Sequence, residues 1–495
     1  MTATAPLLEI AHEPWIARAV RRICSFPALL VTLIFARVYW SCRDNIADPD
    51  LWWHLRNAQY FVTHGHFPNF DTYSFTTAGS SWMNHEWLPE LIYYGAFSQF
   101  GLTGIFVVFT ATLAVLLMAV FSLSMKESRD PLASGIATIA GGLLAMVGFG
   151  PRMQNFGWLC FAGIYAILLR FRAERRAPLW LIPPLFAIWI NCHGSWLMGL
   201  IIYGIFVGAG LIRRDVGNVA AAPWTARELK QLIVTGAASV ILLPLNPFGY
   251  RLVLYPFDLA FHQTLNVAAV QEWASIDFND PRGKQVAVVL GAVFLLALIA
   301  RKRWRIDTAL LTAFVLYCGL THIRFLLLAG IVLPPLIAPQ LSGLSFYRPE
   351  KDRRALNALL LAIVGFILVI HFPSNRLLES EVSAAFPVKA AEFLKAHPQQ
   401  GHIFNLYQWG GYLEWNLPEI QTFVDSRTDI YERNGTLEDY LAIINLQGSE
   451  ERLDRHAVSY VLYPAEAPLA YFLSRSPSWV RLYGDRQAVI YGRAR

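Results

Sequence analysis

Long apolar runs recur through the first three quarters of this chain, and they restrict its fold more than any other feature. A helix needs about 20 mostly apolar residues to cross a lipid bilayer. Charged residues make up only 15% of the chain and the mean hydropathy is +0.40, whereas soluble domains carry about a quarter charged residues. We therefore predict an α-helical polytopic membrane protein with about eleven transmembrane helices. The predicted spans are Cys24–Ser41, Thr103–Met125, Leu132–Phe149, Phe156–Phe171, Leu179–Asn191, Trp196–Ile212, Gln231–Leu245, Val286–Ala300, Thr308–Thr321, Phe325–Leu341 and Leu356–Phe372.

Basic residues collect in alternate loops between these runs. Because Lys and Arg favour cytoplasmic loops, the alternation predicts an N-terminus inside and a C-terminal segment outside. Arg18, Arg21 and Arg22 precede the first run and no small-residue cleavage site closes it, so we predict an uncleaved anchor in the cytoplasmic (inner) membrane. This placement accounts for the net charge of +6 without a nucleic-acid partner. The basic loop residues are Lys126 and Arg129; Arg170, Arg172, Arg175 and Arg176; Arg213, Arg214, Arg227 and Lys230; Arg301, Lys302, Arg303 and Arg305; and Arg348, Lys351, Arg353 and Arg354.

Three long segments are then predicted to lie outside. They are loop 1 (residues 42–101), loop 2 (246–285) and a C-terminal segment (373–495) that is long enough for a small core of its own. We predict a transmembrane domain over residues 1–372 and an extracytoplasmic α/β domain over 373–495. None of the five cysteines forms a C-x-x-C pair, so neither a disulfide framework nor a zinc knuckle is predicted. In the C-terminal domain we expect helices at 384–396 and 437–446, strands at 401–406, 422–424 and 458–463, and a hairpin of 480–483 with 488–491.

Loop 1 begins with two carboxylates one residue apart, in Asp48-Pro49-Asp50. One carboxylate can act as a general base on an acceptor hydroxyl. The other can orient that base, or the pair can hold a divalent cation through oxygen ligands. A structural alternative is that Asp50 caps a helix that starts at Leu51.

Loop 1 also contains two stretches with helical periodicity and aromatic faces, residues 51–64 and 86–97. Trp and Tyr favour the membrane interface, so we predict two helices that lie along the membrane surface. Glu86 is a third candidate catalytic carboxylate. His85 precedes it, but no second His follows at the spacing of a zinc protease. The alternative for Glu86 is a favourable charge in the first turn of a helix.

This arrangement resembles the GT-C superfamily of membrane glycosyltransferases, such as its mannosyl- and aminoarabinosyl-transferases. The shared features are an acidic motif directly after the first span, surface helices, many spans and an outer soluble domain, and they cover residues 1–372. The resemblance implies an essential acidic residue in loop 1, which Asp48 and Asp50 both match. It also implies transfer of a sugar, with inversion, from a polyprenyl-phosphate donor to an extracytoplasmic glycan, lipid or protein acceptor.

Ionisable residues also occur at the other outer ends of the predicted spans. Such groups are costly at bilayer depth unless they face a wet cavity or pair with one another. Arg binds phosphate through a planar fork, so Arg152 and Arg324 are candidates for holding the donor phosphate, with His193 as a helper. Each Arg alone could also be a turn residue that reaches the lipid headgroups. Further candidate site residues are His54, His85, Glu272 and His322.

The segment Gln408-Trp409-Gly410-Gly411-Tyr412-Leu413 resembles the soluble domain of the oligosaccharyltransferase catalytic subunit. A Trp-Trp-Asp-Tyr-Gly motif helps to bind the acceptor in that family. Gly replaces the Asp here, which leaves no basis for sequon recognition, so we interpret the segment as a glycine turn packed by Trp409 and Tyr412. The rival function is a transporter, which the proline pairs Pro183-Pro184 and Pro334-Pro335 favour and the scarcity of charges within spans opposes.

Overall fold

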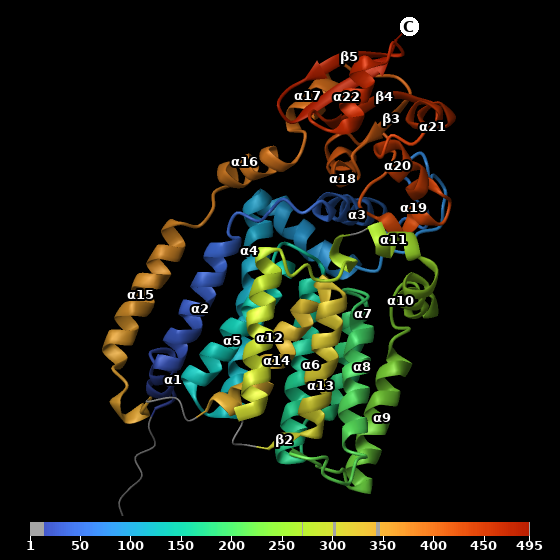
Figure 1. Cartoon of the computed structure of the whole chain (residues 1–495). Helices are drawn as coiled ribbons and strands as arrows, with labels where there is room; N and C mark the ends of the chain where they lie inside the picture. The colour runs from blue at the N-terminus through green and yellow to red at the C-terminus, as the bar shows by residue number, and fades with distance from the viewer. Residues whose placement is uncertain (1–13, 270, 300–302, 343–346, 495) are drawn as a thin grey trace, which may run out of the picture.

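The computed structural model describes residues 14–269, 271–299, 303–342 and 347–494, and within them a helix lies in each of the eleven predicted spans. Ala300, Arg301 and Lys302, which appear in the predictions above, lie outside the described residues. Figure 1 shows the helices as a bundle with the C-terminal domain at one end, which we call the domain end. The eleven helices are α2 (Phe26–Cys42), α4 (Trp87–Ser128), α5 (Pro131–Ala145), α6 (Gln154–Glu174), α7 (Ile182–Ile190), α8 (Trp196–Ala209), α9 (Ala226–Leu242), α12 (Pro281–Ile299), α13 (Ile306–Thr321), α14 (Leu326–Leu341) and α15 (Arg354–Ile370).

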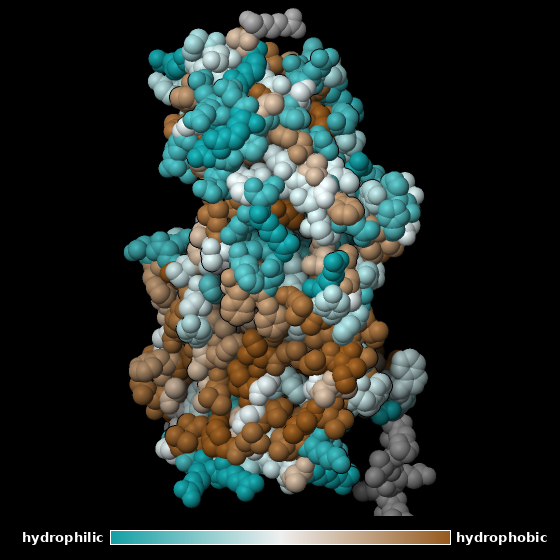
Figure 2. All heavy atoms as spheres, turned by 90° about the vertical axis from the view of Figure 1, so that its right-hand side faces the viewer, coloured by the Kyte–Doolittle hydropathy of each residue, from teal (hydrophilic) through white to brown (hydrophobic). Residues whose placement is uncertain are grey.

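The bundle has the composition of a multi-pass membrane protein. Among the described helices, four are long and apolar enough to cross a bilayer, or six if two bent pairs each count as one span. One pair is α1 (Trp15–Ile23) with α2, bent by 47°, and the other is α15 with α16 (Asn375–Ala385), bent by 60°. Figure 2 shows a broad apolar belt over the bundle, with hydrophilic residues above and below it. The count of eleven spans stays a prediction.

Helix α14 packs closely against α5 because small residues face each other. A Cβ atom added to Gly141 of α5 would lie 2.5 Å from the backbone oxygen of Gly330 of α14, and the reverse contact is equally close. Close backbone approach of this kind drives helix association in lipid, where burial of apolar surface gives little gain. The 3-10 helix η4 (Ile323–Phe325) directly precedes α14, so this packing fixes the position of Arg324.

Loop 1 forms one separate helix and the start of a second. Helix α3 (Asp50–His64) lies across the domain end (Figure 1) and ends at Gly65, whose φ of 73° suits a glycine. The helix predicted at 86–97 is confirmed as the first segment of α4, which continues to Ser128; its predicted place along the membrane surface stays a prediction. The chain breaks inside α4 at Gly101, with φ 62° and ψ −148°, a conformation that residues with a side chain rarely adopt.

The C-terminal domain contains a four-stranded sheet in the order β3-β4-β6-β5. Strand β3 (His402–Asn405) is parallel to β4 (Val458–Pro464), and β6 (Ala488–Arg493) is antiparallel to both β4 and β5 (Trp479–Gly484). The predicted hairpin is confirmed as β5 and β6, and the strands predicted at 401–406 and 458–463 are confirmed as β3 and β4. The two predicted helices correspond to α17 (Val388–Ala396) and α20 (Thr436–Ile444), whereas α18 (Tyr407–Asn416), α19 (Thr428–Glu432), α21 (Ser449–Arg455) and α22 (Pro468–Arg475) were not predicted. The predicted boundary at residue 373 falls between α15 and α16.

The strand predicted at 422–424 is wrong. Thr422 makes only an isolated bridge, and its partner is Ser74 of loop 1. The Thr422 backbone N–H donates to the Tyr73 carbonyl at 3.0 Å, and its carbonyl accepts from the Phe75 N–H at 3.1 Å. The extended conformation therefore serves to join the C-terminal domain to loop 1.

The glycine turn predicted at 408–413 is also wrong, because this segment forms α18. Its glycines permit close packing on two sides. A Cβ on Gly410 would lie 2.3 Å from the Val424 oxygen, and one on Gly411 would lie 3.1 Å from the Pro49 oxygen. Helix α18 can therefore contact the backbone at the start of α3, next to Asp50.

Candidate active site

A cavity of about 550 Å³ lies where the domain end, loop 2 and the C-terminal domain meet. Loop 2 contributes α10 (Tyr250–His262), α11 (Thr264–Ala269) and the 3-10 helix η3 (Gln271–Trp273). The three predicted site residues that do not line the cavity are Asp48, His54 and Arg152, and each contacts a residue that does. The other seven line it: Asp50, His85, Glu86, His193, Glu272, His322 and Arg324.

The two aspartates of loop 1 have different surroundings. Both oxygens of Asp48 are engaged: Oδ1 accepts the Asp50 backbone N–H at 3.0 Å, and Oδ2 accepts Arg152 Nε at 2.8 Å. Asp50 lines the cavity; its Oδ1 accepts a long bond of 3.4 Å from Trp53 Nε1, and its carboxylate also interacts with the Ser426 hydroxyl. Helix α3 begins at Asp50 itself. The alternative that Asp50 caps this helix is therefore wrong, since the carboxylate that accepts the first N–H belongs to Asp48.

Asp50 is able to exchange a proton near neutral pH. Burial raises the pKa of its carboxyl to about 7, and the negative charge of Asp48 acts in the same direction. His54, Ser426 and Arg152 oppose this rise. A carboxyl that titrates close to the working pH suits general base catalysis.

Arg152 joins loop 1 to loop 2. Its guanidinium pairs with Asp48 and also with Glu272 of η3. Burial lowers the pKa of Arg152, but these two carboxylates raise it further, so the net pKa is above the ordinary value. Burial likewise raises the pKa of Glu272, and Arg152 and Arg324 bring it below its ordinary value. Arg152 is therefore a fixed cation whose charge is already neutralised by protein groups.

Arg324 is a cation of the cavity wall without a bonded partner. Within the part of the chain that the structure describes, its guanidinium makes no hydrogen bond or ion pair. Its Cζ lies 4.3 Å from the ring centroid of Trp273, a cation–π contact. His322 Nδ1 is 2.8 Å from the Trp273 carbonyl oxygen and so helps to hold this platform. The arrangement presents an available planar fork to the cavity, as an anionic phosphate requires.

His54 is held between two carboxylates. Its Nδ1 is 2.7 Å from Glu90 Oε1, and its Nε2 is 3.1 Å from Glu86 Oε2. Burial lowers the pKa of His54, but these two partners raise it to about 10, so the imidazole is a cation at neutral pH. Burial raises the pKa of Glu86, and His54 and the nearby histidines hold it well below its usual range. Glu86 therefore stays ionised and is a poor proton acceptor.

His193 was predicted to help hold the donor phosphate, and the alternative for Glu86 was a charge in the first turn of a helix. Burial lowers the pKa of His193 to about 3, so the ring is neutral. Its Nε2 is 3.3 Å from Glu86 Oε1, and its Nδ1 accepts the Ser195 N–H at 2.9 Å, so both nitrogens are used within the protein. Glu86 is the residue before α4, and Glu90 rather than Glu86 occupies the first turn.

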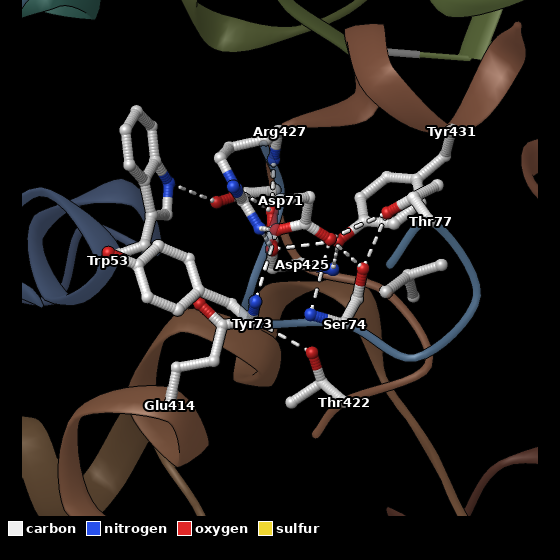
Figure 3. A network of polar contacts seen from close by, with 12 residues as sticks. Trp53, Asp71, Tyr73, Ser74, Thr77, Glu414, Thr422, Asp425, Arg427 and Tyr431 are labelled. Atoms are coloured by element: carbon white, nitrogen blue, oxygen red, sulfur yellow. Dashed lines mark hydrogen bonds and ion pairs between the residues drawn. The ribbon is translucent and has the colours of Figure 1, made fainter. Parts of the chain in front are cut away.

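An ion cluster that was not predicted from the sequence joins loop 1 to the C-terminal domain (Figure 3). Arg427 is only 3% exposed. Its Nε lies 3.0 Å from both oxygens of Asp425, and its Nη2 lies 2.8 Å from Asp71 Oδ1. The rings of Tyr73 and Trp82 lie about 5 Å from its Cζ. Asp425 and Arg427 stand two residues apart, but no local pattern connects them to Asp71.

The described residues contain no group of three or more His, Cys, Asp or Glu side chains arranged to hold a metal ion. Asp48, one of the two predicted ligands, already uses both oxygens. The predicted cation site at Asp48 and Asp50 therefore has no complete ligand set in this arrangement.

The sequence matches no family model and no curated protein, but solved structures share its fold. The oligosaccharyltransferase of Archaeoglobus fulgidus, tethered with an acceptor peptide containing the NVT sequon, superposes with a TM-score of 0.55 at 13% identity, over 98% of this chain and 74% of that one. ArnT from Cupriavidus metallidurans, bound to undecaprenyl phosphate, gives 0.52 at 12% identity, over 94% of this chain and 97% of ArnT. Both enzymes are GT-C glycosyltransferases. The chain has the GT-C fold. The expectation drawn from the acidic motif of loop 1 is thereby confirmed at the level of fold.

In this GT-C fold, residues far apart in the sequence surround one cavity. The archaeal enzyme has also been solved as AglB with an inhibitory peptide and a dolichol-phosphate, with a TM-score of 0.51 at 12% identity over 97% of this chain and 75% of that one. Another structure of the archaeal enzyme is a complex with Zn and sulfate. These GT-C structures contain lipid phosphates, a peptide and a metal ion, and they indicate which ligands to test.

Proposed function

We propose that this protein is a membrane glycosyltransferase that moves a sugar from a polyprenyl-phosphate donor to a hydroxyl group of an extracytoplasmic acceptor. The observation that carries the proposal is that Asp50 and Arg324 line one cavity of a GT-C fold. Asp50 titrates near neutrality, and the Arg324 guanidinium has no hydrogen bond or ion pair with any residue that the structure describes. The proposal draws further support from ArnT, which was solved with undecaprenyl phosphate, and from AglB, which was solved with a dolichol-phosphate.

The cavity offers the parts of a lipid-phosphate site beside Arg324. Apolar side chains of the bundle share the cavity with this guanidinium, as the start of a prenyl chain would require. Arg324 would bind the donor phosphate through its two-pronged fork. The apolar lining residues on this side are Trp158, Leu197, Met198, Tyr317, Cys318 and Phe325.

The proposed reaction is a single displacement. The acceptor hydroxyl gives its proton to the Asp50 carboxylate as the oxygen attacks the anomeric carbon. The bond between that carbon and the phosphate oxygen breaks, and its electron pair leaves with the polyprenyl phosphate. Arg324 stabilises the charge on this leaving group. Attack opposite the leaving group inverts the anomeric configuration. Arg152 and Asp48 position Asp50 and Glu272 around this step.

The test supplies purified protein in nanodiscs with a panel of undecaprenyl-phosphate sugars and a panel of candidate acceptors that carry free hydroxyl groups. Mass spectrometry measures the release of undecaprenyl phosphate and the glycosylated acceptor. Asp50→Asn should abolish release while undecaprenyl phosphate still binds. Arg324→Ala should weaken undecaprenyl phosphate binding by about 10- to 150-fold, because hydrogen bonds to charged groups contribute about 1.5–3 kcal/mol. Asp44→Asn and Arg282→Ala are the matched controls, since Asp44 and Arg282 are exposed and neither lines the cavity.

The result that overturns the proposal is unchanged release by Asp50→Asn, or unchanged lipid-phosphate binding by Arg324→Ala. Flux of a substrate across liposomes without any covalent product would support the transporter instead. The proposal also includes location in the cytoplasmic membrane with the site on the outer side, which the placement of basic residues in the loops supports. Labelling of an introduced cysteine in the C-terminal domain of intact cells tests this orientation.

A further inference from the structure

The cavity has a second wall with a different chemistry from the wall beside Arg324. Four consecutive residues of the C-terminal domain, Ser426 to Asp429, line it together with Trp53 and His85. Two buried atoms of these residues lack a hydrogen-bond partner in the described chain: Arg427 Nη1 and His85 Nδ1. Buried polar atoms in proteins are almost always paired. On residues that line a cavity, such unpaired atoms are positions at which a bound molecule can supply the partner.

The charge of this wall restricts what that molecule can be. Asp71 and Asp425 both pair with Arg427. Burial raises the pKa of Asp71, but Arg427 and the hydroxyls around Asp71 hold it below its ordinary value, so this carboxylate is ionised. Two carboxylates against one guanidinium leave an excess of negative charge. A phosphate or carboxylate would be repelled here.

The unpaired Nη1 excludes a cationic amine as its partner, because an ammonium group has no lone pair to accept a hydrogen bond. A neutral oxygen remains. The same wall also has groups that can accept hydrogen bonds: Ser426 Oγ, Thr428 Oγ1 and the carboxylate of Asp429. Donors and acceptors side by side suit a molecule with several hydroxyl groups, since each hydroxyl both donates and accepts.

This wall also adjoins the base of the proposed reaction. The indole Nε1 of Trp53 lies 3.0 Å from Ser426 Oγ and 3.4 Å from Asp50 Oδ1. One N–H group thus contacts both the second wall and Asp50. A hydroxyl held against Ser426 would lie next to the carboxylate that is proposed to remove its proton.

We propose that Ser426, Arg427, Thr428, Asp429 and His85 form the acceptor subsite, and that the acceptor presents a neutral sugar with free hydroxyl groups to it. This inference rests on the proposed function, and it names the class of acceptor. The donor phosphate binds at Arg324, the acceptor sugar binds at the C-terminal domain, and Asp50 lies within reach of both.

Saturation-transfer NMR on the full-length protein in nanodiscs tests the subsite with four defined probes. These are cellobiose, N,N′-diacetylchitobiose, glucuronic acid and an Asn-Val-Thr peptide, each added alone. We expect binding of a neutral disaccharide and none of glucuronic acid. Ser426→Ala and Arg427→Lys should each weaken disaccharide binding at least tenfold, while undecaprenyl phosphate binding stays unchanged. Ser380→Ala, on the exposed face of α16, is the matched control.

Each outcome decides between the two proposals. Three results would overturn the sugar subsite. They are failure of both neutral disaccharides to bind, stronger binding of glucuronic acid or the peptide, and disaccharide binding that Ser426→Ala leaves unchanged. The proposed function survives that result if undecaprenyl phosphate still binds through Arg324. Conversely, disaccharide binding that depends on Ser426, in a protein that does not bind undecaprenyl phosphate, would retain the subsite and refute the donor. Ser426→Ala keeps the test valid if Arg427→Lys fails to fold.

Discussion

Replacing Asp48 with Asn separates the roles of the two aspartates of loop 1. In the wild-type protein the Asp50 carboxyl has a pKa of about 7. About one tenth of Asp50 is then ionised at pH 6 and about nine tenths at pH 8. If ionised Asp50 is the base, the transfer rate rises about tenfold between these two pH values.

Asp48→Asn removes a negative charge that raises the pKa of Asp50. It also removes one of the two carboxylates that form ion pairs with Arg152 among the described residues, so the positive charge of Arg152 lowers the pKa of Asp50 more strongly. Both effects have the same sign. A fall of about one unit, equivalent to about 1.4 kcal/mol, would leave about half of Asp50 ionised at pH 6. Activity at pH 6, relative to the plateau at high pH, should then be about fivefold higher than in wild type.

The assay measures initial rates of undecaprenyl phosphate release from pH 5 to pH 9 at constant ionic strength, together with thermal unfolding to confirm that each variant is folded. Asp44→Asn should leave the acidic limb of the profile unchanged, because Asp44 is exposed, does not line the cavity and pairs with Arg43 rather than with Arg152. Loss of transfer at every pH in folded Asp48→Asn, with retained transfer in Asp50→Asn, would show that Asp48 is the base. An unshifted limb in Asp48→Asn would refute the electrostatic coupling.

Three further predictions concern stability. The folded-state pKa of His54, about 10, exceeds its unfolded value of about 6.5. The stabilisation that protonated His54 gives is therefore complete below about pH 6.5 and disappears as the pH rises through about 10. His54→Gln should lower the free energy of unfolding by about 3–5 kcal/mol at neutral pH, and it should flatten the fall in melting temperature between pH 7 and pH 10. Gly101→Ala should destabilise the protein by about 1–3 kcal/mol through backbone strain, with a Cβ 3.1 Å from Asn375 Oδ1, whereas Gly95→Ala, with open space around it, should not lower the melting temperature. Asp71→Asn should cost about 3–5 kcal/mol because it removes a partner of buried Arg427, and limited proteolysis should then cleave the C-terminal domain faster than in the exposed control Asp454→Asn.

Local patterns in the sequence were sufficient for the helices of the bundle and for most of the candidate site. Hydropathy located a helix in every predicted span, and the alternation of basic loops placed the ten candidate residues on one side. Seven of them line the same cavity. Their individual roles were not predictable, since they depend on distant contacts: Asp48 pairs with Arg152, 104 positions later, and Ser426 reaches Trp53 across 373 positions.

The errors in the C-terminal domain have the same physical origin. Thr422 has the extended backbone of a strand, but its partner is in loop 1 rather than in the sheet. Gly410 and Gly411 suggested a turn because glycine is common in turns. They are in fact small residues that let α18 approach two other backbone segments. Thr422 and Gly411 contact loop 1, and Gly410 contacts Val424 of its own domain; no short window of sequence contains these contacts.

The ion pair between Asp71 and Arg427 also determines when the site is complete during synthesis. The two residues are 356 positions apart, and a ribosome adds about 5–20 residues per second. Arg427 is therefore synthesised about 20–70 seconds after Asp71 of loop 1. During this interval Asp71 lacks the Arg427 partner that it has in the complete structure. Because Ser426 and Arg427 come late in the chain, a protein that ends after α15 retains the helices of the bundle but lacks the second wall of the cavity.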